Sequence, residues 1–350
     1  MSFLTKDFDY DLPKELIAQF PSENRGQSRL LVYHQTTGII EHKQFPDLID
    51  YLLPTDILVV NDSKVIPARL WATDPASGKQ IELLLIHRIT YNLWTALTRP
   101  AKRCQPGMTL SIGYDKMLAR IVDKLEGSRR QIEFSYTGDW NDLLAELGEM
   151  PVPPYIKRNS ESNDLKQLDK SRYQTVYAQY HGSIAAPTAG LHFSEEIIQK
   201  IKDKGIKIVA VTLHVGPGTF QPVRVDKIID HKMEPEYYTV SQETAEMINT
   251  AKRNQQRIVV VGTTATRTLE TVTDEHGLVY PGEGWSGIFI YPGYKFKVVD
   301  VLLTNFHLPQ STLLMLVSAF AGKEKILQVY QEAIREKYRF YSYGDAMLII

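Results

Sequence analysis

The sequence predicts an α/β protein with a mixed sheet in its main domain and a small antiparallel β-barrel inserted into that domain. Two observations predict this fold class. After Tyr173, helix-like and strand-like segments alternate, which is typical of a sheet covered by helices. Between about residues 61 and 137 the segments are short and strand-like, with little helical period, which favours a small barrel. We therefore expect a discontinuous main domain, residues 1–60 and 138–350, and an inserted barrel domain, residues 61–137.

The first sixty residues predict a helix, a hairpin and a strand. Pro13 suits the first turn of a helix over residues 14–18. The apolar segments 30–33 and 39–40 flank Thr36-Thr37-Gly38, which indicates a hairpin. Residues 56–60 predict a short apolar strand.

The segment from Asn61 to Thr137 differs from the rest of the chain in both pattern and charge. It contains 12 Lys and Arg against 7 Asp and Glu, a net charge of +5, whereas the remainder carries −6. A basic module on an acidic body suits a polyanion that docks on one face. Surface lysines of an ordinary small β module are the alternative explanation. The predicted strands are residues 81–86, 93–98, 108–112, 118–122 and 131–136.

Beyond the barrel, residues 139–147 predict a helix that Gly148 ends. Residues 151–156 are expected to be extended because three prolines restrict the backbone. Residues 157–171 are polar, and we expect this stretch to be mobile.

The last half of the chain supplies the alternation. Ser194 is the expected N-cap of a helix that ends at Gly205. A strand over residues 206–211, a helix over 242–254, a strand over 257–261 and a helix from Thr264 follow. Near the end, an amphipathic helix is predicted by apolar residues at helical spacing, namely Ile326, Val329, Tyr330, Ala333 and Ile334.

Composition narrows the class of protein. The chain has 350 residues, of which 43% are hydrophobic, and a formal net charge of −1. Its single cysteine, Cys104, excludes an internal disulfide framework and a cysteine zinc site, and it suits a reducing compartment. The N-terminus does not resemble a signal peptide, and no apolar run approaches the ~20 residues that span a bilayer. We expect a cytoplasmic protein without membrane contact, and a monomer by default.

Three histidines share one pattern, in which the histidine stands between two apolar residues at the end of an apolar run. They are His192, His214 and His307, and each adjoins a stretch rich in Gly, Pro, Thr or Ser. A titratable ring where a strand breaks into a loop is how α/β proteins build sites at a sheet edge. A buried, hydrogen-bonded histidine is the alternative for each alone, and the repeated pattern favours a shared pocket. Metal binding is disfavoured because the chain has no His-x-His or His-x-x-x-His pair.

Two further segments suit ligand binding. Gly262, Thr263 and Thr264 join a predicted strand to a predicted helix. Free backbone N–H groups at this point favour binding of a carboxylate, phosphate or ribose. The guanidinium of Arg267 can donate two hydrogen bonds to a carboxylate. An ordinary tight turn is the alternative, and neither a Gly-x-Gly-x-x-Gly nor a P-loop pattern is present. After His214, two glycines allow close approach of a ligand, and an aromatic ring can stack on a base; this segment comprises Gly216, Gly218, Thr219 and Phe220. Residues 230–238 alternate charges and aromatics, as a binding surface or a solvated loop does.

Seven segments of the chain carry long and unusual motifs, namely residues 61–70, 173–177, 185–193, 213–223, 291–294, 304–312 and 338–347. They include Ala-Ala-Pro-Thr-Ala-Gly-Leu-His-Phe around His192 and Leu-His-Val-Gly-Pro-Gly-Thr-Phe around His214. These motifs resemble the S-adenosylmethionine:tRNA ribosyltransferase-isomerase family of queuosine biosynthesis. The resemblance spans essentially the whole chain.

The resemblance implies a larger α/β domain with an inserted β-barrel, and it implies a transferase reaction. The ribosyl group of S-adenosylmethionine would move to 7-aminomethyl-7-deazaguanine (preQ1) at the wobble position of tRNA. Epoxyqueuosine would form there, and adenine and methionine would leave. The implied partners are S-adenosylmethionine and tRNA carrying preQ1, with S-adenosylmethionine a consumed substrate and no separate cofactor or metal.

The residue chemistry fits such a reaction, because a sulfonium acidifies the neighbouring C5′ proton and a base of near-neutral pKa suffices. We expect His192 or His214 to be that base, with the other histidine or His307 as acid or orienting group. The expected substrate-binding residues are Thr188, Phe193, Gly216, Gly218, Thr219, Phe220, Gly262, Thr263, Thr264 and Arg267. The expected tRNA contacts are Lys64, Arg69, Lys102 and Arg103.

Three other functions are weighed against this one. An RNA methyltransferase would use the same donor, but the usual glycine-rich loop after a first strand is absent. A non-catalytic tRNA-binding protein would suit the basic module and leave the histidine pattern unexplained. A three-histidine metal hydrolase would be revealed by metal analysis.

Overall fold

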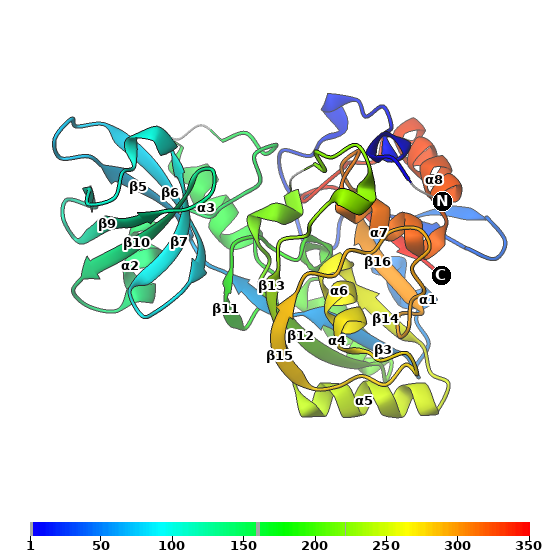
Figure 1. Cartoon of the computed structure of the whole chain (residues 1–350). Helices are drawn as coiled ribbons and strands as arrows, with labels where there is room; N and C mark the ends of the chain where they lie inside the picture. The colour runs from blue at the N-terminus through cyan, green and yellow to red at the C-terminus, as the bar shows by residue number, and fades with distance from the viewer. Residues whose placement is uncertain (1–2, 159–161, 221) are drawn as a thin grey trace.

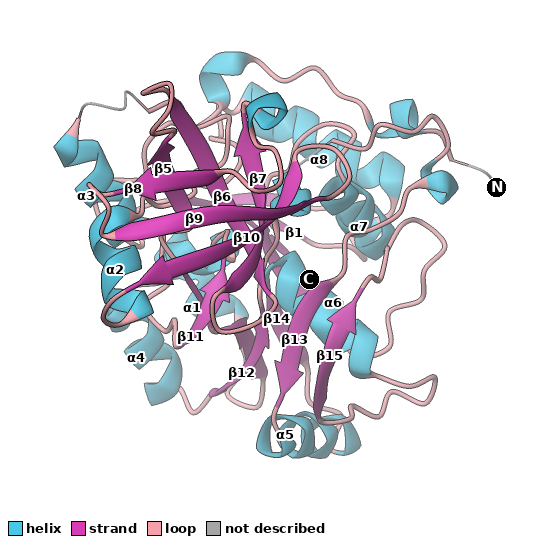
Figure 2. Cartoon of the chain, turned by 60° about the vertical axis from the view of Figure 1, so that its left-hand side comes forward, coloured by secondary structure: helices cyan, strands magenta, loops and turns pink. Residues whose placement is uncertain are grey.

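The structure is a computed structural model that describes residues 3–158, 162–220 and 222–350 (Figure 1). It has a nine-stranded mixed sheet with helices and a closed six-stranded antiparallel barrel. The barrel stands to one side of the main domain (Figure 1), and in the turned view of Figure 2 its strands come to the front. The predicted fold class is therefore confirmed.

The nine-stranded sheet has the order β15-β13-β12-β3-β14-β16-β17-β1-β2. Its strands are β1 (Arg29–Tyr33), β2 (Ile40–Gln44), β3 (Ile57–Asn61), β12 (Lys207–Leu213), β13 (Glu236–Val240), β14 (Ile258–Val261), β15 (Gly282–Ser286), β16 (Val301–Asn305) and β17 (Ala346–Ile349). Because β12, β3, β14 and β16 pair in parallel, their carboxyl ends meet at one edge. Ligand sites of α/β proteins lie at such an edge.

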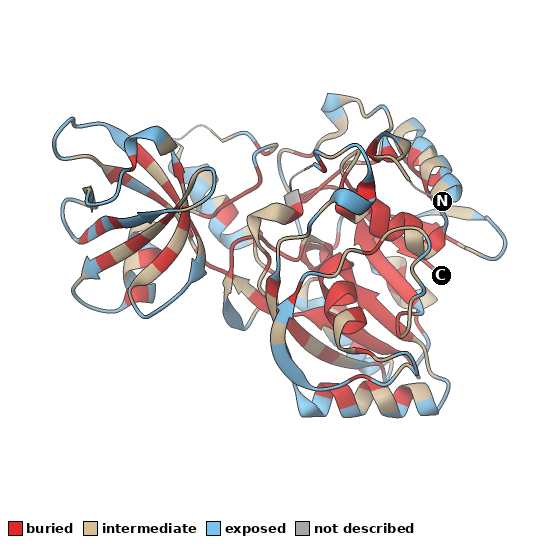
Figure 3. Ribbon diagram, viewed as in Figure 1, coloured by how far each residue is buried: buried red, intermediate tan, exposed pale blue. Residues whose placement is uncertain are grey.

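Alternating side chains bury both faces of the central strands. From β3, Leu58 and Val60 pack with α1 (Leu48–Tyr51) and α4 (Glu195–Asp203). Ile57 and Val59 pack on the other face with α5 (Gln242–Arg253) and α6 (Gly262–Val272). Because successive side chains point to opposite faces and both faces are buried, the whole strand is apolar. Figure 3 shows the central strands as buried.

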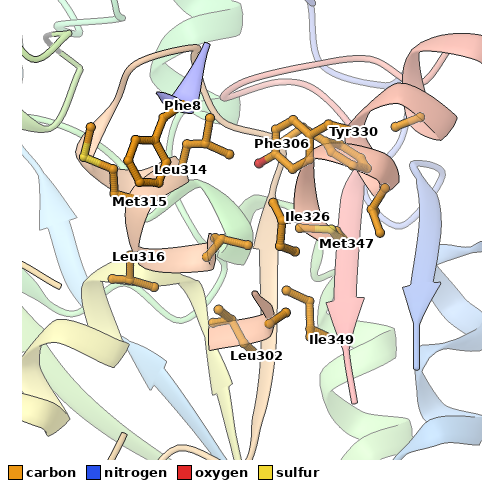
Figure 4. Packing of buried hydrophobic residues seen from close by; sticks show 14 of the residues in the cluster. Phe8, Leu302, Phe306, Leu314, Met315, Leu316, Ile326, Tyr330, Met347 and Ile349 are labelled. Carbon is orange, nitrogen blue, oxygen red and sulfur yellow. The ribbon is translucent and has the colours of Figure 1, made fainter. Parts of the chain in front are cut away.

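A further apolar cluster covers the β16–β17 side of the sheet. There, α7 (Thr312–Ala321) and α8 (Lys323–Arg335) pack against strand residues such as Leu302 and Met347. Figure 4 shows how Phe306 and Tyr330 complete this core beside Leu314. The predicted amphipathic helix near the end of the chain is α8.

The barrel consists of β5 (Arg69–Thr73), β6 (Gln80–Arg88), β7 (Leu93–Arg99), β8 (Thr109–Ile112), β9 (Met117–Lys124) and β10 (Arg129–Tyr136). Five of these strands cover the predicted ones, and β5 is additional. Helix α2 (Trp140–Leu147) begins at the cap Asp139, and its Trp140 and Leu144 lie in the barrel core. This helix thus packs with the barrel although it follows the predicted boundary at residue 137.

The chain enters and leaves the barrel at one place. At the barrel's base, Arg69 and Glu149 exchange two backbone hydrogen bonds, of 3.2 and 2.8 Å. Nearby, β4 (Ser63–Val65) pairs in parallel with β11 (Tyr180–Ser183). These contacts fix the barrel against the sheet edge.

Two local predictions were wrong. Residues 157–171 were expected to be mobile, but α3 (Asn163–Arg172) forms there; residues 159–161 lie outside the described part of the chain. Polar partners order this segment, since Arg158 binds the buried carboxylate of Asp169 at 2.7 and 2.9 Å. The helix expected over residues 14–18 is only a 3-10 turn, because Ile17 instead forms a β-bridge with Phe340.

The remaining elements are short 3-10 helices: η1 (Thr5–Phe8), η2 (Lys14–Leu16), η3 (Phe45–Asp47), η4 (Ala101–Arg103), η5 (Thr188–His192), η6 (Pro217–Phe220) and η7 (Ile228–Asp230). Across the described residues, every helix is too short or too polar to cross a bilayer.

Candidate active site

A cavity of about 360 Å³ lies between the barrel and the main domain, and we call it the interdomain pocket. Its walls are rich in aromatic rings. The barrel and α2 contribute His87, Arg88, Trp94 and Trp140, and the main domain contributes His181, Gly182, His214, Gly216, Pro217, Glu234, Glu236, Tyr237 and Trp285. Apolar walls with a few polar groups are typical of a small-molecule site.

His214 is the predicted histidine that lines this pocket. It follows β12 directly, and its ring stacks on Tyr237 with centroids 6.1 Å apart and planes 10° apart. Burial lowers its pKa below the ordinary value of 6.5, so that the ring is neutral near pH 7. Its Nδ1 is buried and has no hydrogen-bond partner among the described residues. A neutral imidazole has one unprotonated ring nitrogen, and this nitrogen can accept a proton.

Gly182 makes room for the His214 ring. A Cβ atom at this position would lie 2.8 Å from Cε1 and 2.9 Å from Nδ1 of His214. The backbone φ of Gly182 is +146°, a conformation that other residues rarely adopt. The position of the imidazole therefore depends on a glycine in β11.

A second cavity, of about 560 Å³, lies on another side of His214. His181 and His214 line both cavities. The second cavity is more polar, with Asp62, Thr212 and Thr244 in its wall. Asp62 accepts a hydrogen bond of 2.6 Å from the Thr212 hydroxyl, and burial raises the pKa of its carboxyl.

Glu236 connects the predicted glycine loop to the predicted arginine. One carboxylate oxygen accepts hydrogen bonds from the backbone N–H of Gly216 at 2.7 Å and from Thr219 Oγ1 at 3.0 Å. The other oxygen pairs with Arg267. Arg267 therefore binds a carboxylate, as predicted, but this carboxylate belongs to Glu236 and not to a ligand.

Asn61 holds the ends of neighbouring strands together. Its Nδ2 donates to the carbonyl of Leu213 at 3.1 Å and to Thr264 Oγ1 at 3.2 Å. Its Oδ1 accepts from the backbone N–H of Leu213 and of Ser63, each at 3.1 Å. The residue that precedes His214 is therefore fixed from both sides.

His192 occupies a different environment, deep in the main domain. Its Nε2 lies 3.2 Å from Asn305 Nδ2, a donor, so Nδ1 carries the proton and faces Ser28 Oγ at 2.7 Å. The ring stacks on Phe45, with centroids 5.1 Å apart. Burial is the main cause that lowers its pKa to about 4.

His307 is buried just after the end of β16, whose last residue, Asn305, contacts His192 at the end of the 3-10 helix η5. Its Nε2 lies 2.8 Å from Thr304 Oγ1, its backbone N–H donates to Tyr330 Oη, and burial lowers its pKa to about 3. Neither His192 nor His307 lines the interdomain pocket. The expected common pocket does not form because β3 and β14 separate β12 from β16, a span of ~14 Å at the usual strand spacing.

The other expected substrate residues are divided among several places. Gly216 lines the interdomain pocket, whereas Gly218 and Thr219 line an adjoining cavity of about 220 Å³ with His231 and Glu234. Gly262, Thr263 and Thr264 begin α6 and are buried, Phe193 is a core residue, and Thr188 begins η5. The side chain of Phe220 lies outside the described part of the chain.

The expected tRNA contacts lie on the barrel and at its base. Lys102 and Arg103 are exposed in η4, and Lys64 is half-buried in β4. Arg69 pairs with Glu82 at 3.1 Å and donates to the carbonyl of Val152, so its guanidinium is largely engaged. None of these four residues lines the interdomain pocket.

Most of the pocket wall has no local signal in the sequence. The aromatic residues Trp94, Trp140 and Trp285 had no local signal, because they come from three distant segments. Glu234 and Glu236 lie in the segment 230–238, whose alternating charges and aromatics indicate a binding surface or a solvated loop. In the described residues, no group of three or more His, Cys, Asp or Glu side chains is placed to hold a metal ion.

Comparisons with known proteins give one consistent result. A family model described as "Queuosine biosynthesis protein" matches residues 5–349. The chain is 52% identical over 99% of both chains to the S-adenosylmethionine:tRNA ribosyltransferase-isomerase of Clostridioides difficile. It is 54% identical to the protein of the same name from Caldanaerobacter subterraneus, over 98% of this chain and 99% of that one.

A solved structure is also similar over the whole chain. It is the crystal structure of S-adenosylmethionine tRNA ribosyltransferase from Thermotoga maritima, which is 39% identical. The match covers 98% of this chain and 100% of that one, with a TM-score of 0.55.

Proposed function

The chain belongs to the queuosine biosynthesis protein family, and we propose on this basis that it is an S-adenosylmethionine:tRNA ribosyltransferase-isomerase that reacts in the interdomain pocket. It transfers the ribosyl group of S-adenosylmethionine to the aminomethyl nitrogen of preQ1 at the tRNA wobble position. The C–S bond and the bond to adenine break, methionine and adenine leave, and the isomerised group remains on tRNA as epoxyqueuosine.

The observation that supports this location is the position of His214 between two cavities. A reaction that joins two large substrates needs a group that both can reach. The aromatic interdomain pocket suits a flat heterocycle, since rings stack favourably in offset or edge-on arrangements. The more polar second cavity, with Asp62 and Thr212, suits hydroxyl and ammonium groups.

His214 is proposed as the general base. A sulfonium draws electrons from the neighbouring C5′ carbon, so a base of modest strength can remove a proton there. Burial keeps the pKa of His214 below 6.5, and the ring is therefore in its basic, neutral form at physiological pH. His192 and His307 are proposed to hold the strand ends rather than to transfer protons, because protein groups contact both ring nitrogens of His192 and Nε2 of His307.

The proposal includes no separate cofactor, since S-adenosylmethionine supplies the transferred group and is consumed. We also propose that the protein is a monomer and that it acts in the cytoplasm. Its single cysteine, Cys104, is free and buried, which suits a reducing compartment. The proposed tRNA contacts on the barrel remain Lys64, Lys102, Arg103 and, to a lesser extent, the ion-paired Arg69.

The test is incubation with S-adenosylmethionine and tRNA that carries preQ1, with products followed by mass. We expect equal amounts of adenine, methionine and modified tRNA. His214→Ala should slow adenine release by about 10²- to 10⁴-fold, the usual contribution of a general base. His276→Ala is the matched control, because His276 is an exposed histidine that does not line the pocket.

Three outcomes would contradict the proposal. S-adenosylhomocysteine in place of adenine and methionine would indicate a methyltransferase. Binding of tRNA without turnover would indicate a non-catalytic protein. Near-parental turnover of the His214→Ala variant would exclude His214 as the base, and folded His192→Asn and His307→Asn variants would then be compared for loss of adenine release.

A further inference from the structure

We infer that the turn between β6 and β7, with Arg88 and Tyr91, contacts RNA and stacks an unpaired nucleobase at the mouth of the interdomain pocket. We call these two residues the stacking turn. The inference rests on the proposed function, since it requires RNA as the substrate. It extends that function by identifying the barrel as the unit that grips nucleotides beside the reacting one.

The stacking turn is held in place by its own hydrogen bonds. Arg88 donates from Nη2 to the carbonyl of Tyr91 at 2.7 Å, and from Nε to the carbonyls of Thr90 and Tyr91 at 3.3 Å. The guanidinium consequently lies over the Tyr91 ring, 5.2 Å from its centroid. A cation over an aromatic ring is fixed before any ligand arrives, which lowers the entropy cost of binding.

The exposed ring of Tyr91 is the outer member of a series of rings that reaches the pocket. Tyr91 is 68% exposed, and its ring lies 6.0 Å from that of Tyr136. Tyr136 contacts Trp140, and Trp140 stacks on Trp94 at 5.4 Å. Trp94, Trp140 and Arg88 all line the interdomain pocket. A flat group placed on Tyr91 would thus lie outside the pocket and next to it.

One residue of the pocket wall has a buried hydrogen-bond donor without a partner in the part of the chain that the structure describes. Trp94 is only 5% exposed, and its indole N–H has no hydrogen-bond partner in the described residues. A buried donor without a partner destabilises the protein unless a ligand or water accepts from it. A heterocycle in the pocket would contact the Trp94 ring, and its neighbours along a strand would extend toward Tyr91.

Charge and shape favour RNA over a protein partner at this turn. The segment 61–137 carries a net charge of +5, and the turn presents a guanidinium and an open ring. Proteins recognise single-stranded RNA by stacking bases on aromatic rings and arginine planes. An isolated exposed tyrosine is common, so the arginine bound over the ring and the continuity with the pocket are what distinguish Tyr91.

The experiment compares Tyr91→Ala with Tyr114→Ala in the full chain. Tyr114 is also a fully exposed barrel tyrosine in a turn, between β8 and β9, and it does not line the pocket. Binding of a fluorescent anticodon stem-loop is measured by anisotropy, and the KM values for tRNA and for S-adenosylmethionine are measured separately. Tyr91→Phe tests whether the ring itself suffices.

We expect Tyr91→Ala to weaken stem-loop binding by about 5- to 100-fold, the usual loss for one stacked base. The loss should appear in the KM for tRNA, with little change in the KM for S-adenosylmethionine. Tyr91→Phe should bind within about threefold of the parent, because stacking needs the ring and not the hydroxyl. Arg88→Gln should reduce the slope of log affinity against log salt by about one.

Parental stem-loop binding by Tyr91→Ala, or an equal loss in Tyr114→Ala, would overturn the inference. The first of these results would leave a protein partner as the remaining explanation of the turn. Failure of the proposed function is distinguishable, because parental protein that binds the stem-loop but releases no adenine refutes only the reaction. Absence of any stem-loop binding by the parent would refute both.

Discussion

The carboxylate of Glu236 lies 2.5 Å from the guanidinium of Arg267, and both side chains are at least 96% buried. Glu236 opens β13, and Arg267 lies one turn into α6, so the pair joins two elements that flank the candidate site. The same carboxylate holds the loop after His214 through Gly216 and Thr219.

Replacement of Glu236 by Gln should therefore destabilise the protein strongly. The change leaves Arg267 buried without its counter-charge, which costs about 3–5 kcal/mol of unfolding free energy in comparable pairs. Urea unfolding monitored by circular dichroism measures this loss. Glu234→Gln is the control, because Glu234 and its partner Arg129 are more than one-third exposed and their pair is worth ~1 kcal/mol at most. Equal losses in the two variants would contradict the prediction.

Gly182→Ala should impair turnover through the position of His214. The new methyl group would lie 2.8 Å from the imidazole and displace it, and a shift of about 1 Å in a reacting group can cost ~100-fold in rate. Gly282→Ala is a matched control, because Gly282 has a φ of +148° but no atom of the described residues lies within 4 Å of the added group. Both variants should lose about 1–3 kcal/mol to backbone strain. If both also lost turnover equally, ring displacement would not be the cause.

The pH dependence of kcat/KM should show an acid limb that belongs to His214. Burial lowers the pKa of this ring, so the basic form persists until the pH falls below the ordinary value of 6.5. Activity should then decrease as the pH decreases through the lowered pKa, since the protonated ring cannot act as a base. Adenine release measured between pH 4.5 and 8, in conditions where the protein stays folded, checks this. An acid limb that persists unchanged in a residual activity of His214→Asn would assign it to another group.

Acid should destabilise the fold through His192 and His307. In the folded protein their pKa values are about 4 and about 3, whereas an exposed histidine has 6.5. Below pH 6.5 the unfolded chain binds more protons, so the free energy of unfolding decreases by up to ~1.4 kcal/mol per pH unit for each ring. Stability from His192 is fully present above pH 6.5 and is lost as the pH falls toward 4.

Urea unfolding at pH 7, 6 and 5 measures this dependence. His192→Asn should reduce the pH dependence of the free energy of unfolding by the contribution of one ring, although the variant is less stable at pH 7. The exposed His276→Asn variant should keep the parental dependence. A His192→Asn protein with the parental pH dependence would show that another group is responsible.

Local patterns predicted most of the fold because they depend on neighbours in sequence. Ser194 accepts a hydrogen bond from the backbone N–H of Ile197, as an N-cap does, and α4 begins where that cap predicts. The five barrel strands followed from short apolar alternation and turn residues. The ordered helix α3 could not be predicted from local patterns. The carboxylate of its Asp169 is bound by Arg158, which lies outside the helix, and by Tyr343, which lies near the far end of the chain.

The candidate site was predictable only in part, for a similar reason. The histidine pattern selected His214, which lines the interdomain pocket, but it equally selected His192 and His307, which do not line it. The order of the strands in the sheet decides which strand ends lie close together. This order depends on pairing between segments that are distant in the sequence, and no single segment encodes it. The pocket wall contains both Trp94 from the barrel and Trp285 from β15. These residues line one pocket only when the whole chain is folded.

The two backbone hydrogen bonds between Arg69 and Glu149 have a topological consequence. Their geometry is that of the base of a β-hairpin, so the whole barrel can be regarded as the elaborated tip of one hairpin. A tight turn joining these two positions would leave the strand order β12-β3-β14-β16 unchanged. The strand order that positions His214 therefore does not include any strand of the barrel that completes its pocket.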